Sequence, residues 1–359
     1  MKMEYYKHEI YKEELNHIIE KEYFVKKFKG VKVLITGARG MIGSMLIDAI
    51  MLANEKIDLS CRIYALVRSE QARERFSEYS HNPLFNLIFA DINKDRIDIQ
   101  DDVDYVIHAA SNTHPLQYSQ KPIETLLTNV IGTNNLLEFA VEHNCKRFVF
   151  CSSVEIYGEN KNDIGSFTEE DCGYINCNTL RANYPEGKRA GEALCRGYMQ
   201  EKKLDVVIPR LARCYGAGLH TDDSKALTQF LKNGLRKEDI VLKSAGTQYF
   251  SYCYQADAVD AIVSILAKGE SGEAYNITSK DSDIHLRDLA KLIAESFGVK
   301  VIFDLPKEDE AAGFSKANDA RLDTNKIHGI GWESEYGISD GIRRTSEILS
   351  SVHFSQKDE

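Results

Sequence analysis

The chain has 359 residues, 43% of them apolar, which is enough for one large α/β domain with a smaller lobe and excludes a disordered chain. Its formal net charge of −10 argues against nucleic acid or an anionic membrane as the main partner, because both select for basic surfaces. The eight cysteines have neither paired zinc spacings nor a compact disulfide framework, so we expect a reducing compartment and no metal site.

Residues 1–30 are predicted to form a helical extension before the first strand. Apolar side chains recur there among lysines and glutamates at amphipathic spacing: Tyr5, Ile10, Leu15, Ile18, Ile19 and Phe24. The first residues are charged and aromatic where a secretory signal needs an apolar core, and no later apolar run approaches the roughly 18 residues of a membrane-spanning helix. We therefore expect a soluble, cytoplasmic protein with no membrane partner.

From Val31 onward, apolar runs of strand length alternate with helical stretches. The runs are Val31–Thr36, Ile63–Val67, Leu87–Ala90, Tyr105–Ala109, Arg147–Cys151 and Val206–Pro209. Strands with so few polar residues have no face toward water, so the alternation predicts a parallel sheet covered by helices on both sides. A mixed pattern follows, with helices near 225–235, 257–267 and 286–297 and a strand near 240–242.

This order predicts an α/β fold built on a doubly wound parallel sheet of the Rossmann type. We assign residues 31–209 to this sheet, with a return near 250–267. Residues 210–249 and 268–359 are predicted to form a smaller, mixed α/β C-terminal lobe that binds substrate. Open α/β sheets bind ligands at the carboxyl ends of their strands, so we expect the lobe to lie there.

The first strand leads into a glycine-rich loop, and we expect the next helix to start with Ser44. The spacing Gly-x-x-Gly-x-x-Gly allows a tight turn and a close approach of a pyrophosphate to the free N–H groups of the helix. A bare structural turn is the alternative, but the strand before and the helix after favour a dinucleotide site. The predicted cofactor contacts are Gly37, Arg39, Gly40, Met41, Ile42 and Gly43.

The residue after the second strand bears on which dinucleotide is bound. An acidic residue there bonds the ribose hydroxyls of NAD, whereas an arginine accommodates the extra phosphate of NADP. Arg68 follows Val67, so NADP is favoured and NAD stays possible; a merely solvated arginine is the alternative. Asp91 and Ile92 follow the third strand and are expected near the adenine.

Tyr184 and Lys188 are four residues apart at the start of a predicted helix, hence on one face. A phenol has a pKa near 10, so its use as a base near neutral pH requires roughly 4 kcal/mol, which a cation about 4 Å away can supply. Ser153, close after a strand, offers a hydroxyl to the reacting oxygen. Alone, the pair is equally consistent with a surface helix; with the glycine loop and Ser153 it predicts a redox centre.

Together these motifs resemble the extended short-chain dehydrogenase/reductase family, in particular its nucleotide-sugar epimerases, dehydratases and decarboxylases. The resemblance covers residues 31–348 and includes further motifs: His108-Ala109-Ala110-Ser111, Thr128-Asn129-Val130-Ile131-Gly132-Thr133, Arg181–Arg189, Ala274-Tyr275-Asn276-Ile277 and Gly331-Trp332. It implies that Tyr184 is the acid/base for the sugar hydroxyl, that Lys188 orients the nicotinamide ribose, and that Ser153 bonds the same hydroxyl.

The resemblance implies further contacts. Those to NAD(P) are Ala109, Ala110, Ser111 and Asn129, with Asn129 a helix-kinking or water-binding residue. Those to a nucleotide-sugar substrate are Ser111, Thr113, Arg181, Asn183 and Arg213. Many relatives dimerise through two long helices of the dinucleotide-binding half, so a homodimer is expected.

Glu155 lies two residues before Tyr157, where dehydratases and decarboxylases of the family commonly carry a glutamate and simple 4-epimerases do not. After oxidation at C4, its carboxylate could remove the acidified C5 proton. The alternative is a salt-bridged residue below the pocket.

Four positions depart from the family pattern. Val154 stands where dehydratases of deoxythymidine-diphosphate-glucose have an aspartate, and Gly218 where glucuronate decarboxylases have an arginine for the substrate carboxylate. The family usually has asparagine at the position of Arg213 and arginine at that of Phe250. The forked guanidinium of Arg213 could take over phosphate binding, or it could pair with a nearby acid.

The leading hypothesis is an enzyme that oxidises a nucleotide sugar at C4 and returns the hydride, as a 4,6-dehydratase or epimerase. An NADPH-dependent reductase of a keto-sugar or nucleotide-linked ketose and a UDP-glucuronate decarboxylase are alternatives. A non-catalytic dinucleotide-binding protein is a third, which the intact Ser153, Tyr184 and Lys188 disfavour.

Overall fold

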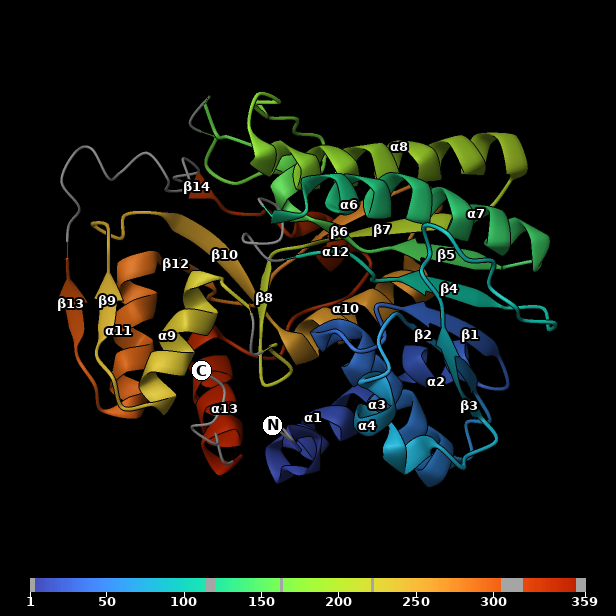
Figure 1. Ribbon diagram of the computed structural model, residues 1–359, viewed down its shortest axis with the longest axis horizontal. Helices are drawn as coiled ribbons and strands as arrows, with labels where there is room; N and C mark the ends of the chain where they lie inside the picture. The colour runs from blue at the N-terminus through green and yellow to red at the C-terminus, as the bar shows by residue number, and fades with distance from the viewer. Residues whose placement is uncertain (1–3, 114–119, 162–163, 221–222, 305–318, 353–359) are drawn as a thin grey trace.

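A parallel β-sheet forms the centre of the larger part of the molecule (Figure 1). The computed structural model describes residues 4–113, 120–161, 164–220, 223–304 and 319–352. The strands are β1 (Lys32–Thr36), β2 (Arg62–Val67), β3 (Phe85–Phe89), β4 (Tyr105–His108), β5 (Arg147–Phe150), β6 (Ser152–Ser153), β7 (Val206–Leu211) and β11 (Ala274–Ile277). Their order is β11-β7-β5-β4-β1-β2-β3 with β6 beside β7, and every pairing is parallel. The order reverses between β1 and β4, which confirms the doubly wound Rossmann-type fold.

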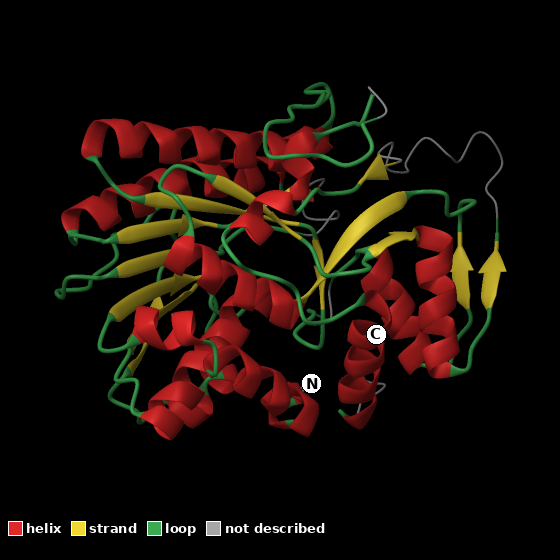
Figure 2. Ribbon diagram, turned by 180° about the vertical axis from the view of Figure 1, so that it is seen from behind, coloured by secondary structure: helices red, strands yellow, loops and turns green. Residues whose placement is uncertain are grey.

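Helices cover both faces of this sheet because its strands are apolar on both sides (Figure 2). Val33 and Ile35 point into one core and Leu34 into the other, as the two-residue period of a strand requires. The first face is covered by α3 (Met41–Ile57) and α10 (Gln255–Lys268). The second is covered by α6 (Pro122–Leu127), the π-helical turn η3 (Thr128–Gly132), α7 (Thr133–Glu142) and α8 (Asn183–Lys202).

The predicted N-terminal helical extension is confirmed. It consists of η1 (Tyr5–Lys7), α1 (Glu9–Ile19) and α2 (Glu22–Phe28), and it packs on α3 and α10 (Figure 1). The Tyr11 hydroxyl donates to Asp48 of α3 at 2.8 Å, and the Tyr23 hydroxyl donates to Asp260 of α10 at 2.5 Å. The extension therefore completes the core on this face of the sheet.

A smaller set of elements begins where β7 ends. β8 (Arg213–Tyr215), β10 (Tyr249–Tyr254), β12 (Asp283–His285) and β14 (Asp319–Ala320) form a second sheet, and β9 (Ile240–Leu242) pairs with β13 (Val301–Phe303). The helices are α9 (Ala226–Leu235), α11 (Leu286–Phe297), α12 (Asn325–Gly329) and α13 (Ile338–Ser351). The helices predicted near 225–235, 257–267 and 286–297 and the strand near 240–242 are confirmed.

One assignment within the predicted lobe is wrong. Residues 268–359 were expected in the substrate-binding lobe, but β11 pairs with β7 at the edge of the large sheet. Its four residues are all buried, and their apolar pattern fits a covered parallel strand. The other limits of the two predicted units stay a prediction.

Short helices connect the remaining elements: α4 (Ala72–Arg75), η2 (Ser77–Tyr79), η4 (Val154–Tyr157) and η5 (Leu180–Ala182). Across the described parts of the chain, no helix combines the length and the apolar character needed to cross a membrane.

Candidate active site

The glycine loop joins β1 to α3 through a turn that side chains could not occupy. Gly37 has a φ of 65°, and a Cβ there would lie 2.6 Å from the Ala109 carbonyl oxygen. A Cβ on Gly43 would lie 2.5 Å from the Gly37 carbonyl oxygen. The loop thus packs tightly against the end of β4, and glycine is required at both positions.

The helix after the loop begins at Met41, not at Ser44 as expected, because the loop is shorter than the glycine spacing suggested. Gly40 precedes it and offers no side-chain cap, so the first N–H groups of α3 stay available to an anion. Ile42 lies in this first turn, and Arg39 in the loop is bonded to Gln71 at 2.6 Å. The loop and the helix end therefore suit a dinucleotide pyrophosphate.

Arg68, at the carboxyl end of β2, has its charge already balanced. Its guanidinium is half exposed, bonded to Glu124 at 2.6 Å and to Asn112 at 3.4 Å. A 2′-phosphate would have to compete with Glu124 for it, which weakens the preference for NADP. Asp91 and Ile92 lie just after β3, the first partly exposed and the second buried.

The residues after β4 line the same edge of the sheet. The Ala110 N–H donates to the Thr36 hydroxyl at 3.3 Å, and the Ser111 hydroxyl donates to Asn129 at 3.0 Å. Asn129 is fully buried in the π-helical turn and donates to the Thr125 carbonyl at 2.8 Å. Its place in an irregular turn agrees with the helix-kinking role that the resemblance implied.

Tyr184 and Lys188 occupy the first two turns of α8, and both are buried. The Lys188 ammonium donates to the Cys151 carbonyl at 2.8 Å and lies 4.8 Å from the centre of the Phe150 ring. Burial lowers the pKa of Lys188 to about 8. Burial likewise raises the pKa of Tyr184, and a hydrogen bond with Ser153 acts in the opposite direction. The predicted constellation of tyrosine, lysine and serine is thus brought together at the end of β5.

Glycines allow α8 to approach the sheet closely enough for this. A Cβ on Gly191 would lie 2.4 Å from the Phe150 ring, and one on Gly187 would lie 3.0 Å from the Asn129 Cβ. Gly191 was not among the residues predicted from the sequence. Its only signal was its position three residues after Lys188 on the same helix.

A buried polar network beneath the site also escaped the sequence analysis. Ser152 donates to Glu192 at 2.5 Å, and Glu192 forms an ion pair with Arg210 at 2.8 Å. Arg210 donates to the Tyr157 hydroxyl at 2.9 Å, which in turn donates to Asn276 of β11 at 2.6 Å. This network ties α8, η4, β7 and β11 together behind Ser153. Its only signal in the sequence was Asn276, which lies within the family motif Ala274-Tyr275-Asn276-Ile277.

Glu155 lies in η4 with two arginines beside its carboxylate. Arg181 approaches it to 3.3 Å and Arg213 to 3.4 Å. Burial acts to raise the pKa of Glu155, but Arg181 and Arg213 outweigh it, and the pKa is held below its usual range. The Arg213 guanidinium also stacks on Phe250, 3.7 Å from the ring centre. The structure therefore contains both of the ion pairs raised as alternatives from the sequence, Glu155 as a salt-bridged residue and Arg213 paired with a nearby acid.

The remaining predicted substrate residues lie around this point. Asn183 begins α8 and donates to the Leu180 carbonyl at 2.9 Å, and Thr113 is half-buried after β4. Gly218 donates its N–H to Gln255 at 2.9 Å, and a Cβ there would come within 3.2 Å of Met41. Little room is thus left beside the cofactor loop for the arginine that glucuronate decarboxylases carry at this position.

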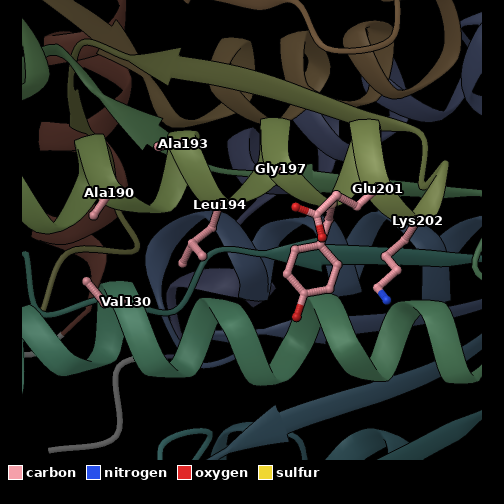
Figure 3. Close-up of a pocket in the computed structure, with 8 residues that line it drawn as sticks. Val130, Ala190, Ala193, Leu194, Gly197, Glu201 and Lys202 are labelled. Atoms are coloured by element: carbon pink, nitrogen blue, oxygen red, sulfur yellow. The ribbon is translucent and has the colours of Figure 1, made fainter.

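A separate hollow of about 570 Å³ lies between α8 and the neighbouring helix that carries Val130 (Figure 3). Val130 of η3 and Ala190, Ala193 and Leu194 of α8 line its apolar part. None of the predicted catalytic or cofactor residues borders it.

Comparisons with known proteins agree with this geometry. The model of the NAD dependent epimerase/dehydratase family matches residues 33–278. UDP-glucuronic acid decarboxylase 3 of Arabidopsis thaliana is 28% identical over 318 residues, covering 87% of each chain. A dTDP-glucose 4,6-dehydratase from Streptomyces venezuelae with NAD bound is 25% identical at a TM-score of 0.75, covering 89% of this chain and 97% of that one. UDP-glucose 4-epimerase of Thermotoga maritima, at 22% identity, 89% and 99% coverage and a TM-score of 0.74, shares the fold.

Proposed function

The chain belongs to the NAD dependent epimerase/dehydratase family, and on this premise we propose that it oxidises C4 of a nucleotide-linked sugar. The observation that supports this most is the burial of Tyr184 and Lys188 on α8 beside Ser153. The glycine loop, Ala109, Ala110 and Ser111 would hold NAD(P), which would accept a hydride from the sugar and later return it. Such a cycle consumes no net reductant.

In this proposal Tyr184 takes the proton of the C4 hydroxyl, and Ser153 holds the same oxygen in place. The Lys188 ammonium keeps the phenolate form accessible, since a cation nearby favours the charged form of an acid. With a pKa of about 8, Lys188 is still mostly protonated at neutral pH. The hydride thus leaves carbon C4, and the proton leaves the oxygen bonded to it.

Glu155 is proposed as the second acid or base, as in a 4,6-dehydratase or an epimerase that acts beyond C4. Oxidation at C4 acidifies the C5 proton, and a carboxylate within reach can remove it. Val154, which is buried and apolar, cannot supply the acid for water loss that an aspartate would supply. Elimination would therefore need Glu155 or Tyr184 to protonate the departing hydroxyl.

Incubation with a panel of UDP-, dTDP- and GDP-linked sugars, followed by mass spectrometry, tests the proposal. Loss of water indicates dehydration, and an isomer of unchanged mass indicates epimerisation. Tyr184→Phe is the matched control, because it removes one oxygen. Tight NAD(P) binding without conversion of any sugar would contradict the proposal and favour a non-catalytic dinucleotide-binding protein.

UDP-glucuronate decarboxylation is a second candidate, which the similarity to the Arabidopsis thaliana decarboxylases favours. The presence of Gly218 counts against it, because no arginine stands there for the substrate carboxylate. Release of carbon dioxide from UDP-glucuronate distinguishes this reaction in the same panel.

An NADPH-dependent reductase is a third candidate, which rests on Arg68 alone. The pairing of Arg68 with Glu124 reduces its support. Net loss of NADPH absorbance with a keto-sugar would favour it, whereas dissociation constants much lower for NAD than for NADP would exclude the phosphate role of Arg68.

We also propose a homodimer formed through α6, η3, α7 and α8. Large apolar side chains are exposed on three of these elements: Ile123, Leu127, Ile131 and Val141. A second copy that covers these four side chains would remove apolar surface from water, which favours association. Sedimentation velocity should show a dimer that Leu127→Glu together with Ile131→Glu dissociates, whereas Val241→Glu, at an exposed apolar position of β9, leaves it intact.

A further inference from the structure

The Glu155 carboxylate is shared loosely between arginines of two different elements. A single nitrogen of Arg181, Nη2, lies 3.3 Å from Oε2 and 3.5 Å from Oε1 of Glu155, and Nη2 of Arg213 lies 3.4 Å from Oε1. Strong hydrogen bonds between charged groups are shorter, about 2.7 to 2.9 Å. The arginines therefore hold Glu155 mainly by charge, in contacts that a better acceptor could replace.

Arg213 has spare binding capacity. One of its terminal nitrogens faces Glu155, while the other, Nη1, is buried and has no hydrogen-bond partner among the described residues. A buried N–H without an acceptor is unfavourable, so this atom indicates an acceptor that comes from outside the chain. Phe250 stacks on the guanidinium and limits it to motion within its own plane.

The charges around Glu155 favour an anion as that acceptor. Arg181 from η5, Arg213 from β8 and Lys225 just before α9 all act on the carboxylate, and Tyr184 of α8 faces it as a neutral phenol. Lys225 also pairs with Asp223 at 3.5 Å, so three cations meet two acids and the cluster still carries excess positive charge. The planar fork of a guanidinium matches phosphate oxygens closely.

We propose that Arg213 holds Glu155 in the free protein and transfers to the diphosphate of the substrate when it binds, which frees Glu155 to act on the sugar. This inference rests on the proposed function, since a nucleotide-linked sugar carries its diphosphate next to the reacting ring. Arg213 acts here as a positioning residue for Glu155. The acid/base group becomes available only when a substrate with a diphosphate is present.

Loss of one arginine partner strengthens Glu155 as a base. The two arginines together keep the pKa of Glu155 below its usual range although burial acts to raise it. With Arg213 bound to phosphate, only Arg181 and Lys225 still oppose the effect of burial, so the pKa of Glu155 moves upward. A carboxylate with a higher pKa removes a carbon-bound proton more readily.

Calorimetric titration of the NAD-saturated protein with UDP and with dTDP tests the coupling without requiring turnover. Arg213→Gln should weaken diphosphate binding by about 10- to 100-fold, the effect of a lost charged hydrogen bond. Glu155→Gln should tighten it by about 3- to 10-fold, because Arg213 no longer has to leave a carboxylate. In the Arg213→Gln background, Glu155→Gln should have no effect.

A matched control separates this coupling from a general effect of charge. Glu159→Gln also removes one negative charge just beyond η4, where Glu159 pairs with Lys161 and not with Arg213, and it should leave the affinity unchanged. Unchanged NAD affinity shows that each variant is folded.

Two results would overturn the inference while leaving the proposed function intact. One is an unchanged diphosphate affinity in Glu155→Gln, and the other is a gain of equal size in the presence and absence of Arg213. If the wild-type protein binds NAD but none of UDP, dTDP and GDP, titrated in the same way, the proposed function fails and the inference fails with it.

Discussion

Tyr184 is the residue on which the proposed chemistry depends most directly. Tyr184→Phe keeps the ring in its buried place and removes only the hydroxyl, so the fold and cofactor affinity should not change. A positioned acid or base typically contributes about 100- to 10,000-fold, and we expect kcat to fall by that factor with little change in KM. Steady-state kinetics with the substrate found in the panel measure this. A variant that keeps more than about a tenth of kcat would assign the acid/base role to another group.

Burial of Lys188 opposes the stability of the fold. The lowered pKa of about 8 means that the folded protein binds fewer protons than the unfolded chain between pH 8 and 10.5, the ordinary pKa of a lysine. Wild-type stability should therefore rise with pH across this window. Lys188→Met has no such charge. In cofactor-free protein, its free energy of unfolding should therefore exceed that of the wild type by up to about 3 kcal/mol at pH 7 and by less than about 1 kcal/mol at pH 10.

Urea unfolding of both proteins at several pH values measures that difference. The lost bond to the Cys151 carbonyl lowers the advantage equally at every pH, so the trend and not its absolute size is diagnostic. A difference that does not vary with pH would show that Lys188 titrates as an ordinary exposed lysine.

At the scale of single residues, the sequence predicted what local spacing determines. Tyr184 and Lys188 are one helical turn apart, and Ser153 follows a strand whose end could be read from its apolar run. The contact of Glu155 with Arg213 joins residues 58 positions apart, and it depends on how β8 leaves the sheet. Spacing carries no information on that geometry, so only alternatives could be given for both residues.

At the scale of elements, the approach of α8 to β5 determines where the catalytic groups lie. Gly191→Ala would place a Cβ 2.4 Å from the Phe150 ring. Overpacking of this kind costs about 1 to 3 kcal/mol, more than the roughly 1 kcal/mol that alanine gains over glycine in a helix. We expect lower stability and lower kcat, because Tyr184 and Lys188 move with the helix.

Gly197→Ala on the same helix is the matched control, since a Cβ there meets nothing within 4 Å. It should raise the free energy of unfolding by about 0.5 to 1 kcal/mol. Phe150→Leu should restore part of the stability lost in Gly191→Ala. If both glycine variants were equally stable, the close packing of α8 on β5 would not be a constraint.

Element types were predictable because the runs were long and strongly patterned. The six predicted strands of the large sheet and the helices near 225–235 and 286–297 were found in place, whereas β6 and β11 of that sheet were not predicted as strands. β10 was not predicted, because Gln248 to Tyr254 mixes polar and aromatic residues without a clear period. β11 was placed in the wrong unit, since four residues that include the polar Asn276 do not indicate which sheet they join.

At the scale of the whole molecule, the N-terminal extension connects parts that are distant in sequence. Its helices were predictable from their amphipathic spacing, but their partners were not. Glu14 of α1 is fully buried, accepts a hydrogen bond from Tyr254 of β10 at 2.6 Å and lies 3.7 Å from Arg344 of α13. The extension thus contacts both the large sheet's helices and the elements that follow it.

The buried Glu14 should make the stability of the whole molecule depend on pH. Burial raises its pKa from 4.5 to about 7, so between these values the folded protein binds more protons than the unfolded chain. The contribution of Glu14 to stability should therefore be fully present below pH 4.5 and should be lost as the pH rises through 7. Glu14→Gln keeps the bond from Tyr254 without the charge, so it should gain on the wild type by up to about 3 kcal/mol between pH 5 and 8.

Urea unfolding at pH 5, 6, 7 and 8 measures this gain, and Glu13→Gln is the control. Glu13 is the exposed neighbour that also pairs with Arg344; its charge contributes less than burial to the raised pKa of Glu14, so its substitution should change the pH dependence far less. Burial also raises the pKa of Asp257 to about 7, so the stability of Glu14→Gln should still decrease as the pH rises, although less steeply than that of the wild type. A gain that is the same at pH 5 and pH 8 would mean that Glu14 is not protonated in the folded protein, and that Arg344 compensates its charge inside the core.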